Sequence, residues 1–220
     1  MNENNKQQII DNTIRYVRGK LEGEGSGHDW WHVYRVYKSA KAIAANEKAD
    51  EFIVSLGALL HDIADFKFHN GDMEVGPRVA KEWLESLHVD EEIITHIEYI
   101  IRNVSFKGAK VKMTMDTIEG KIVQDADRLD AIGAIGIART FAYGGFKNRE
   151  IYNPDVKPQI HETFEQYKSG SGHSINHFYE KLLLLKDMMN TETGRKMAEE
   201  RHKFMEIYLK EFYDEWDGRK

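Results

Sequence analysis

Residues 57–72 read GALLHDIADFKFHNGD, and an apolar segment typical of a core helix, residues 52–60, leads into them. The polar groups that follow are His61, Asp62, Asp65, Lys67, His69 and Asp72. A helix that enters a core does not normally end in imidazoles, carboxylates and an amine, because burying such groups without partners is costly. The stretch therefore indicates a site at the end of this helix, with His69 and Asp72 either supporting that site or lying as ordinary loop polar groups.

Composition narrows the classes of protein and site. Hydrophobic residues make up 41% and charged residues 31% of the 220, which is ordinary for a globular protein. The net charge is −6 and no block of Lys and Arg occurs, so duplex nucleic acid is not an expected partner. A single phosphorylated small molecule is still compatible with this charge, because it needs only a local cluster of positive groups. The chain has no cysteine, which excludes disulfides, thiolate metal sites and Cys nucleophiles.

The N-terminus MNENNKQQII lacks an apolar targeting region, and no run of about 18 apolar residues occurs. We therefore expect no membrane span and a cytoplasmic location. The length suits a single domain over residues 1–220.

Almost every periodic segment predicts a helix, so the expected fold class is all-α. Pro77 suits a first helical position, Asp50 an N-cap, and the pair Gly144–Gly145 a helix end. The expected helices cover residues 9–21, 29–45, 50–60, 77–87, 90–101, 116–143, 175–189 and 191–216.

One long irregular stretch, residues 144–174, interrupts this pattern, with a short helix expected near residues 159–167. Such loops often cover a substrate. Its charges and rings suit a nucleotide, although a plain solvent loop explains them equally well. They are Lys147, Arg149, Lys157 and Lys168, with Tyr143, Phe146, Tyr152 and Tyr167. The aromatic C-terminal helix is interpreted as core packing or as the surface of a homodimer.

His61 and Asp62 offer one nitrogen and one oxygen ligand, so a divalent cation needs further ligands from elsewhere. His28 and His32 stand four residues apart on one face of the second expected helix. The stretch IVQDADRLDAIGAIG, residues 122–136, places three carboxylates in an apolar helix, where burial requires a cation or donors. The carboxylates belong to Asp125, Asp127 and Asp130. The residues alone leave a metal site and a salt bridge to Arg128 equally open.

The order of these motifs resembles the HD-domain superfamily of metal-dependent phosphohydrolases. The motifs are HVYRV at residues 32–36, the His-Asp doublet, and QDADRLDAIGAIGIARTF at residues 124–141. The resemblance implies a helical bundle in which His32, His61, Asp62 and Asp127 hold metal. An adjacent pair of histidines found in binuclear members is missing here, so a single ion is expected, with His88 and His96 on ordinary helix surfaces.

The resemblance extends to a bacterial subgroup that hydrolyses nucleoside triphosphates to monophosphate and pyrophosphate. Two imidazoles and two carboxylates suit Mn²⁺, which we prefer, as well as Mg²⁺, Ni²⁺ or Fe²⁺. The alternatives are a nucleotide phosphomonoesterase, which uses the same site, and a non-catalytic metal-binding regulatory domain.

Four further residues receive catalytic roles in this interpretation. Asp65 lies one helical turn beyond the doublet and is the expected base for the attacking water. Lys67, Arg35 and His28 are expected to neutralise phosphate oxygens as charge develops. Asp130 either orients a ligand or pairs with Arg128.

Overall fold

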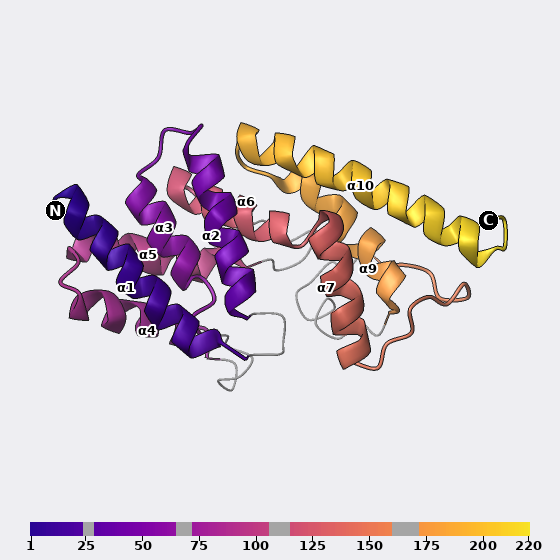
Figure 1. The fold of residues 1–220 in the computed structure, drawn as a ribbon, viewed down its shortest axis with the longest axis horizontal. Helices are drawn as coiled ribbons and strands as arrows, with labels where there is room; N and C mark the ends of the chain where they lie inside the picture. The colour runs from indigo at the N-terminus through magenta and orange to yellow at the C-terminus, as the bar shows by residue number, and fades with distance from the viewer. Residues whose placement is uncertain (24–28, 65–71, 106–114, 160–171) are drawn as a thin grey trace. The chain divides into compact units, whose positions relative to one another are not determined.

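The computed structural model describes residues 1–23, 29–64, 72–105, 115–159 and 172–220. Within these ranges every regular element is a helix and none is a strand, which confirms the all-α prediction (Figure 1). The helices are α1 Glu3–Leu21, α2 Trp30–Ala44, α3 Glu51–Leu60, α4 Val75–Ser86, α5 Glu91–Val104, α6 Ile118–Asp130, α7 Gly133–Phe146, α9 Ser174–Glu180, the 3-10 helix η2 Leu182–Met188, and α10 Glu192–Trp216.

The chain divides into two compact units. Unit 1 comprises residues 1–106 and 113–127, and unit 2 comprises residues 107–112 and 128–220. The boundary between Asp127 and Arg128 falls within α6, so one continuous helix contributes to both. A single domain over residues 1–220 stays a prediction beside this division. No helix in the described ranges is both long and apolar enough to cross a membrane.

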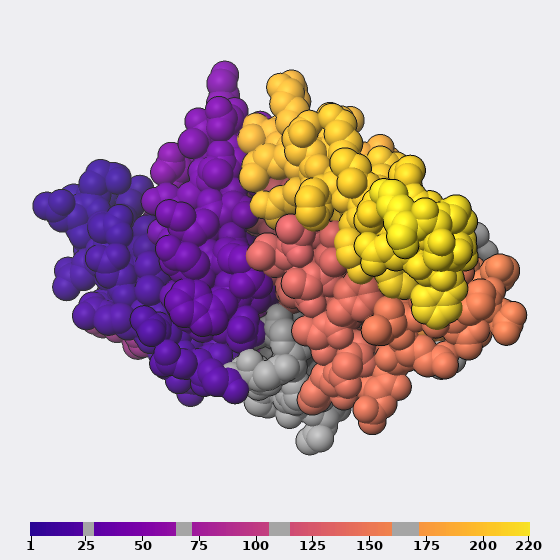
Figure 2. Space-filling view, turned by 45° about the vertical axis from the view of Figure 1, so that its right-hand side comes forward, coloured from indigo at the N-terminus to yellow at the C-terminus, as the bar shows by residue number. Residues whose placement is uncertain are grey.

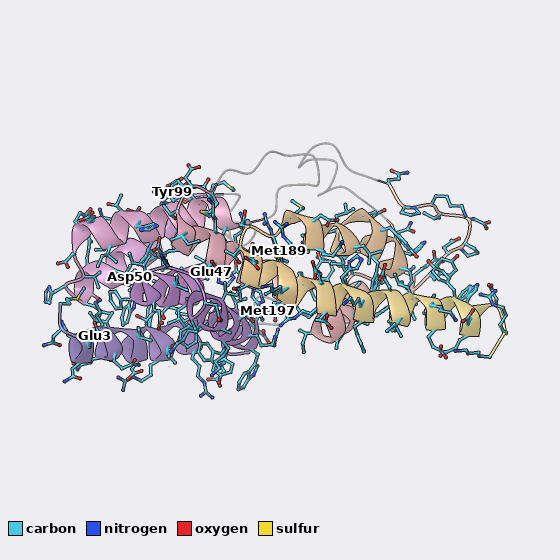
Figure 3. All side chains as sticks on the ribbon, turned by 90° about the horizontal axis from the view of Figure 1, so that it is seen from above. Glu3, Glu47, Asp50, Tyr99, Met189 and Met197 are labelled. Atoms are coloured by element: carbon cyan, nitrogen blue, oxygen red, sulfur yellow. The ribbon has the colours of Figure 1, made fainter. Side chains whose placement is uncertain are left out.

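Helix α3 is the central helix of unit 1, where it packs against α1, α2 and α5. It is apolar on every side, which suits a helix surrounded by others. Its start is set by Asp50, whose side chain accepts hydrogen bonds from the backbone N–H groups of Phe52 and Ile53 at 2.8 and 3.3 Å. Figure 3 shows Asp50 beside this start and Glu3 at the start of α1. The predicted N-cap is therefore confirmed.

The expected helix over residues 116–143 is interrupted, because α6 ends at Asp130 and α7 begins at Gly133. Ile132 between them is extended, with φ −125° and ψ 167°, and Gly133 has φ +74°. That left-handed conformation is open to glycine at little cost. The apolar period of the two helices continues across the break, and for this reason the sequence pattern concealed it.

Gly144 and Gly145 do not end α7, which continues to Phe146. A Cβ on Gly144 would lie 2.2 Å from Ser174 Oγ, so this glycine permits the close approach of α9. Lys147 is the C-cap, and Asn148 directly after it takes the left-handed conformation that often follows a helix end, with φ +53°, which asparagine tolerates.

Three further expectations need correction. Pro77 is the third residue of α4, where its missing N–H is still one of the groups without an intrahelical partner. The expected helix over residues 175–189 is divided at Lys181, with φ −143°, into α9 and η2. The irregular stretch starts after residue 146, while the short helix expected near residues 159–167 lies almost wholly outside the described residues.

In unit 2, α10 packs against α7 and η2, and side chains of α7 and α10 lie at the face drawn in Figure 2. Tyr152 from the irregular stretch contacts the rings of Phe212, Tyr213 and Trp216 at centroid distances of 5.8, 5.5 and 4.9 Å. Phe212 and Tyr213 are half-buried and Trp216 is 51% exposed, so these rings form a partly exposed aromatic cluster, and core packing or a homodimer surface stays a prediction for this helix. Tyr143 and Phe146 are exposed.

Candidate metal centre

His61 and Asp62 stand where α3 ends. His61 is the C-cap residue of α3 and is 5% exposed. Its Nδ1 lies 2.8 Å from the carbonyl oxygen of Ala58. That carbonyl is a hydrogen-bond acceptor, so Nδ1 carries the proton and donates it. The lone pair of the neutral imidazole is therefore on Nε2, which faces the site, and the ring orientation is fixed as in metal-binding histidines.

His32 reaches the same point from α2. Asp29 is the N-cap of α2, and its side chain accepts a hydrogen bond from the backbone N–H of His32 at 2.9 Å, which fixes the first turn of the helix. The His32 side chain is buried, and its Nε2 lies 3.2 Å from Nε2 of His61.

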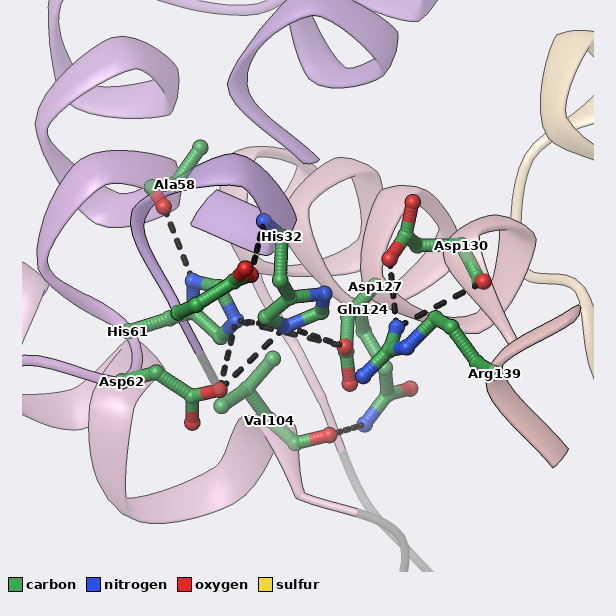
Figure 4. Close-up of polar contacts among 10 residues, drawn as sticks. His32, Ala58, His61, Asp62, Val104, Gln124, Asp127, Asp130 and Arg139 are labelled. Atoms are coloured by element: carbon green, nitrogen blue, oxygen red, sulfur yellow. Dashed lines mark hydrogen bonds and ion pairs between the residues drawn. The ribbon is translucent and has the colours of Figure 1, made fainter. Parts of the chain in front are cut away.

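Two carboxylates complete the cluster. Oδ2 of Asp62 lies 3.2 Å from His32 Nε2 and 3.4 Å from His61 Nε2. Oδ1 of Asp127, on α6, lies 3.5 Å and 3.9 Å from the same two nitrogens. In the view of Figure 4 the two carboxylates lie on either side of the imidazole pair. All four residues belong to unit 1.

These separations fit a shared cation. Two ligand atoms about 2.1 Å from one ion lie about 3.0 Å apart at a right angle and about 3.4 Å apart in a tetrahedron. Most of the measured distances fall near these values, and the ligand atoms of His32, His61 and Asp127 all lie within 4.8 Å of one another. Two nitrogen and two oxygen donors suit a first-row divalent metal. The residues present therefore fit the expected ion.

The electrostatics agree with a site for positive charge. Burial of His61 disfavours its imidazolium form, but Asp62 and Asp127 outweigh that penalty, so the pKa of His61 rises to about 9. The two carboxylates thus create a field that favours a cation beside the two imidazole nitrogens.

A glycine explains why α3 and α6 meet at this point. A Cβ on Gly57 would lie 3.3 Å from Cγ2 of Val123 on α6 and 3.4 Å from Cδ1 of Ile100 on α5. Gly57 stands four residues before His61, and Val123 four residues before Asp127. The two helices therefore approach closely about one turn before each delivers its ligand.

Gln124 adds a link that sequence reasoning missed. Its side chain is buried, and its Nε2 donates to the carbonyl oxygen of Asn103 at 3.1 Å and to that of Val104 at 3.3 Å. Figure 4 shows the bond to Val104. Both carbonyls belong to the last turn of α5, where helices lack intrahelical donors. These hydrogen bonds therefore hold the face of α6 that carries Asp127 against the end of α5. A polar amide beside the apolar residues 122 and 123 was the available signal.

Of the other predicted site residues, two lie within the described ranges and four lie outside them. Arg35 is part-buried on α2, one turn after His32. Asp72 precedes α4 and pairs with Arg78 at 2.9 Å on the surface. The remaining predictions, His28, Asp65, Lys67 and His69, lie outside the described residues.

The neighbouring carboxylates of α6 have different surroundings. Asp125 is completely buried, and Asp130 forms an ion pair with Arg139 of α7. Arg128, the partner expected for Asp130, donates to the carbonyl oxygen of Met188. Asp130 is thus paired with Arg139.

His88 and His96 lie apart from the metal-centre contacts described above. His88 is exposed and takes the left-handed conformation after α4, with φ +55°. His96, on α5, lies 3.8 Å from Glu119.

Comparison with known proteins gives concordant results. A family model for the HD domain matches residues 30–132. YpgQ of Bacillus subtilis is 40% identical over 204 residues, which cover 92% of this chain and 91% of YpgQ.

Solved structures agree. A HD-superfamily hydrolase from Bacillus thuringiensis is 47% identical, with a TM-score of 0.76 over 96% of this chain and 98% of that one. The structure of Bacillus subtilis YpgQ in complex with ADP is 36% identical, with a TM-score of 0.76 over 96% of each chain. This protein belongs to the HD-domain superfamily of metal-dependent phosphohydrolases.

Proposed function

We propose that this protein hydrolyses nucleoside triphosphates to the monophosphate and pyrophosphate. One divalent cation, preferably Mn²⁺, is held by His32, His61, Asp62 and Asp127. The convergence of two imidazole nitrogens and two carboxylate oxygens at separations of 3.2 to 3.9 Å carries the metal part of the proposal. The presence of ADP in the related YpgQ structure supports a nucleotide as substrate. Release of pyrophosphate rests on the sequence resemblance to the bacterial subgroup.

The protein groups have separate tasks in this reaction. A divalent cation at this position supplies Lewis acidity, which polarises a phosphoryl oxygen and lowers the pKa of water. The hydrogen bond from His61 to Ala58 and the cap from Asp29 to the His32 N–H keep both imidazoles oriented, so little reorganisation accompanies binding. Asp65 takes the proton of the attacking water, and Arg35, Lys67 and His28 balance the charge that develops on the phosphate oxygens.

The test is hydrolysis in ¹⁸O-labelled water with Mn²⁺ and a panel of nucleoside triphosphates. Attack at the α-phosphorus places the label in the nucleoside monophosphate and leaves pyrophosphate unlabelled. Asp127→Ala, purified in parallel, controls for contaminating phosphatases. Label in free phosphate, with nucleoside as the other product, would establish the phosphomonoesterase instead. Absence of turnover on every phosphate ester would indicate a regulatory metal-binding domain.

A further inference from the structure

Helix α2 carries two exposed rings beside the proposed metal ligand His32. Trp31 is 56% exposed and Tyr34 is 38% exposed. Within the described part of unit 1, these are the only aromatic side chains with a large exposed fraction. Tryptophan is a largely buried residue on average, so one that faces solvent directly before a metal ligand requires an explanation.

The two rings are held in place by a third. Trp31 and Tyr34 meet edge to face, with centroids 6.0 Å apart and planes at 86°. Tyr34 also contacts Trp30, whose ring centroid lies 5.8 Å away and which is only 5% exposed. The buried Trp30 therefore anchors Tyr34, and Tyr34 supports Trp31. A side chain supported in this way on a helix loses little entropy when a flat ligand settles on it.

Helix geometry relates these rings to the metal centre. Successive residues turn by about 100° around an α-helix, so Trp31 lies about 100° from His32. Arg35 stands four residues after Trp31, so the two lie close together on one face of the helix. Viewed down the helix axis, Arg35 lies between Trp31 and His32. Lys38 stands four residues after Tyr34, so these two also lie close together on one face of the helix. From the buried ligand outward, the helix thus presents a cation and then an exposed indole.

This order matches the layout of a nucleotide, whose charged phosphates and flat base are joined by a sugar. We propose that Trp31, supported by Tyr34, is the platform on which the base of the substrate stacks, while its phosphates lie toward Arg35 and the metal ligands. The inference rests on the proposed function and adds the base-binding residue to it. Stacking uses the face that every base possesses, so the platform accepts purines and pyrimidines with little discrimination.

The experiment compares a ligand that has a base with one that lacks it. Affinities for α,β-methylene-ATP and inorganic tripolyphosphate are measured by calorimetry with Mn²⁺, so that no turnover is needed. Wild type is expected to bind the nucleotide more tightly than tripolyphosphate. Trp31→Ala is expected to weaken nucleotide binding about tenfold, which is the usual scale for one stacked base, and to leave tripolyphosphate binding unchanged. Trp31→Phe retains a stacking plane and is expected to restore most of the affinity.

Phe204→Ala is the matched control, because Phe204 is an aromatic side chain of α10 with a similar exposed fraction, 49%. In kinetics with ATP, Trp31→Ala should raise KM about tenfold with little change in kcat, since stacking contributes equally to ground state and transition state.

Equal binding of the two ligands by wild type, or an unchanged nucleotide affinity in Trp31→Ala, overturns the platform even if ATP is hydrolysed. A nucleotide preference that depends on Trp31 in a protein that hydrolyses no nucleotide keeps the platform and refutes the proposed function.

Discussion

Substitution of Gly57 by alanine is expected to weaken metal binding without unfolding the protein. The added Cβ would meet Val123 Cγ2 at 3.3 Å and Ile100 Cδ1 at 3.4 Å, so α6 must move away from α3 by a few tenths of an ångström. Metal–ligand distances tolerate only about 0.2 Å. Because Asp127 follows Val123 by one turn, we expect metal affinity to fall about tenfold, the lower end of the range for residues that support ligands.

The stability change is expected to be small, because two effects oppose each other. Overpacking of a core costs about 1 to 3 kcal/mol. Replacing a glycine inside a helix by alanine gains up to about 1 kcal/mol. The free energy of unfolding of the metal-free protein should therefore fall by only about 0 to 2 kcal/mol.

Titration of metal-free protein with Mn²⁺ in a calorimeter gives the affinity, and urea unfolding in EDTA gives the stability. Gly19→Ala in α1, where an added Cβ meets nothing within 4 Å, is the control and should leave metal affinity unchanged. The double variant Gly57→Ala/Val123→Ala removes the contact between the added Cβ and Val123 Cγ2. Its metal affinity should therefore recover, while its free energy of unfolding falls further. Wild-type affinity in Gly57→Ala itself would refute the idea that this helix approach positions Asp127.

Three further changes test other parts of the site and the fold. Asp127→Ala should reduce bound metal far below one ion per chain by elemental analysis, because it removes one of four proposed ligands; full occupancy would show that the ligand set is wrong. Asp65→Asn should keep metal and thermal stability while kcat falls roughly 10² to 10⁴-fold, as expected for loss of a general base; loss of metal would make Asp65 a ligand. Burial, helped by Lys181 and Arg149, lowers the pKa of His177 to about 3, so the folded protein binds fewer protons than the unfolded chain below pH 6.5. Stability should therefore drop by about 1 to 2 kcal/mol between pH 6.5 and 5, and urea unfolding of His177→Gln should show a smaller drop; an equal drop in the variant would exclude His177 as its source.

Local chemistry explains what could be predicted from the sequence. An N-cap such as Asp50 accepts hydrogen bonds from backbone N–H groups two and three residues away. The sequence pattern that predicts the cap and the hydrogen bonds that form it therefore involve the same few residues. The proximity of His32, His61 and Asp127 could also be predicted, because His61 stands in a doublet with Asp62 and His32 in a distinct motif. That these residues bind metal stays a prediction. The residues alone left the metal site open, and the order of motifs that resembles the HD superfamily favoured it.

Features that depend on contacts between distant parts of the chain could not be predicted from the sequence. Gly144 looked like a helix end because its role depends on Ser174, which packs against it from α9. Gln124 forms its hydrogen bonds with the end of α5, about twenty residues earlier in the chain. The break before Gly133 leaves the apolar period intact on both sides, so no local pattern marked it.

The carboxylates of α6 show why ligand assignment requires the structure as well as the helical pattern. At about 100° per residue, Asp127 and Asp130 lie about 60° apart, whereas Asp125 lies about 160° from Asp127 and points to the far side of the helix. Asp125 is therefore a poor substitute for a missing ligand. Asp130 has the better direction, but its carboxylate already pairs with the guanidinium of Arg139. A charge-assisted pair of this kind is costly to break once it is partly buried. Loss of the Asp127 carboxylate should consequently leave the metal site without a replacement from its own helix.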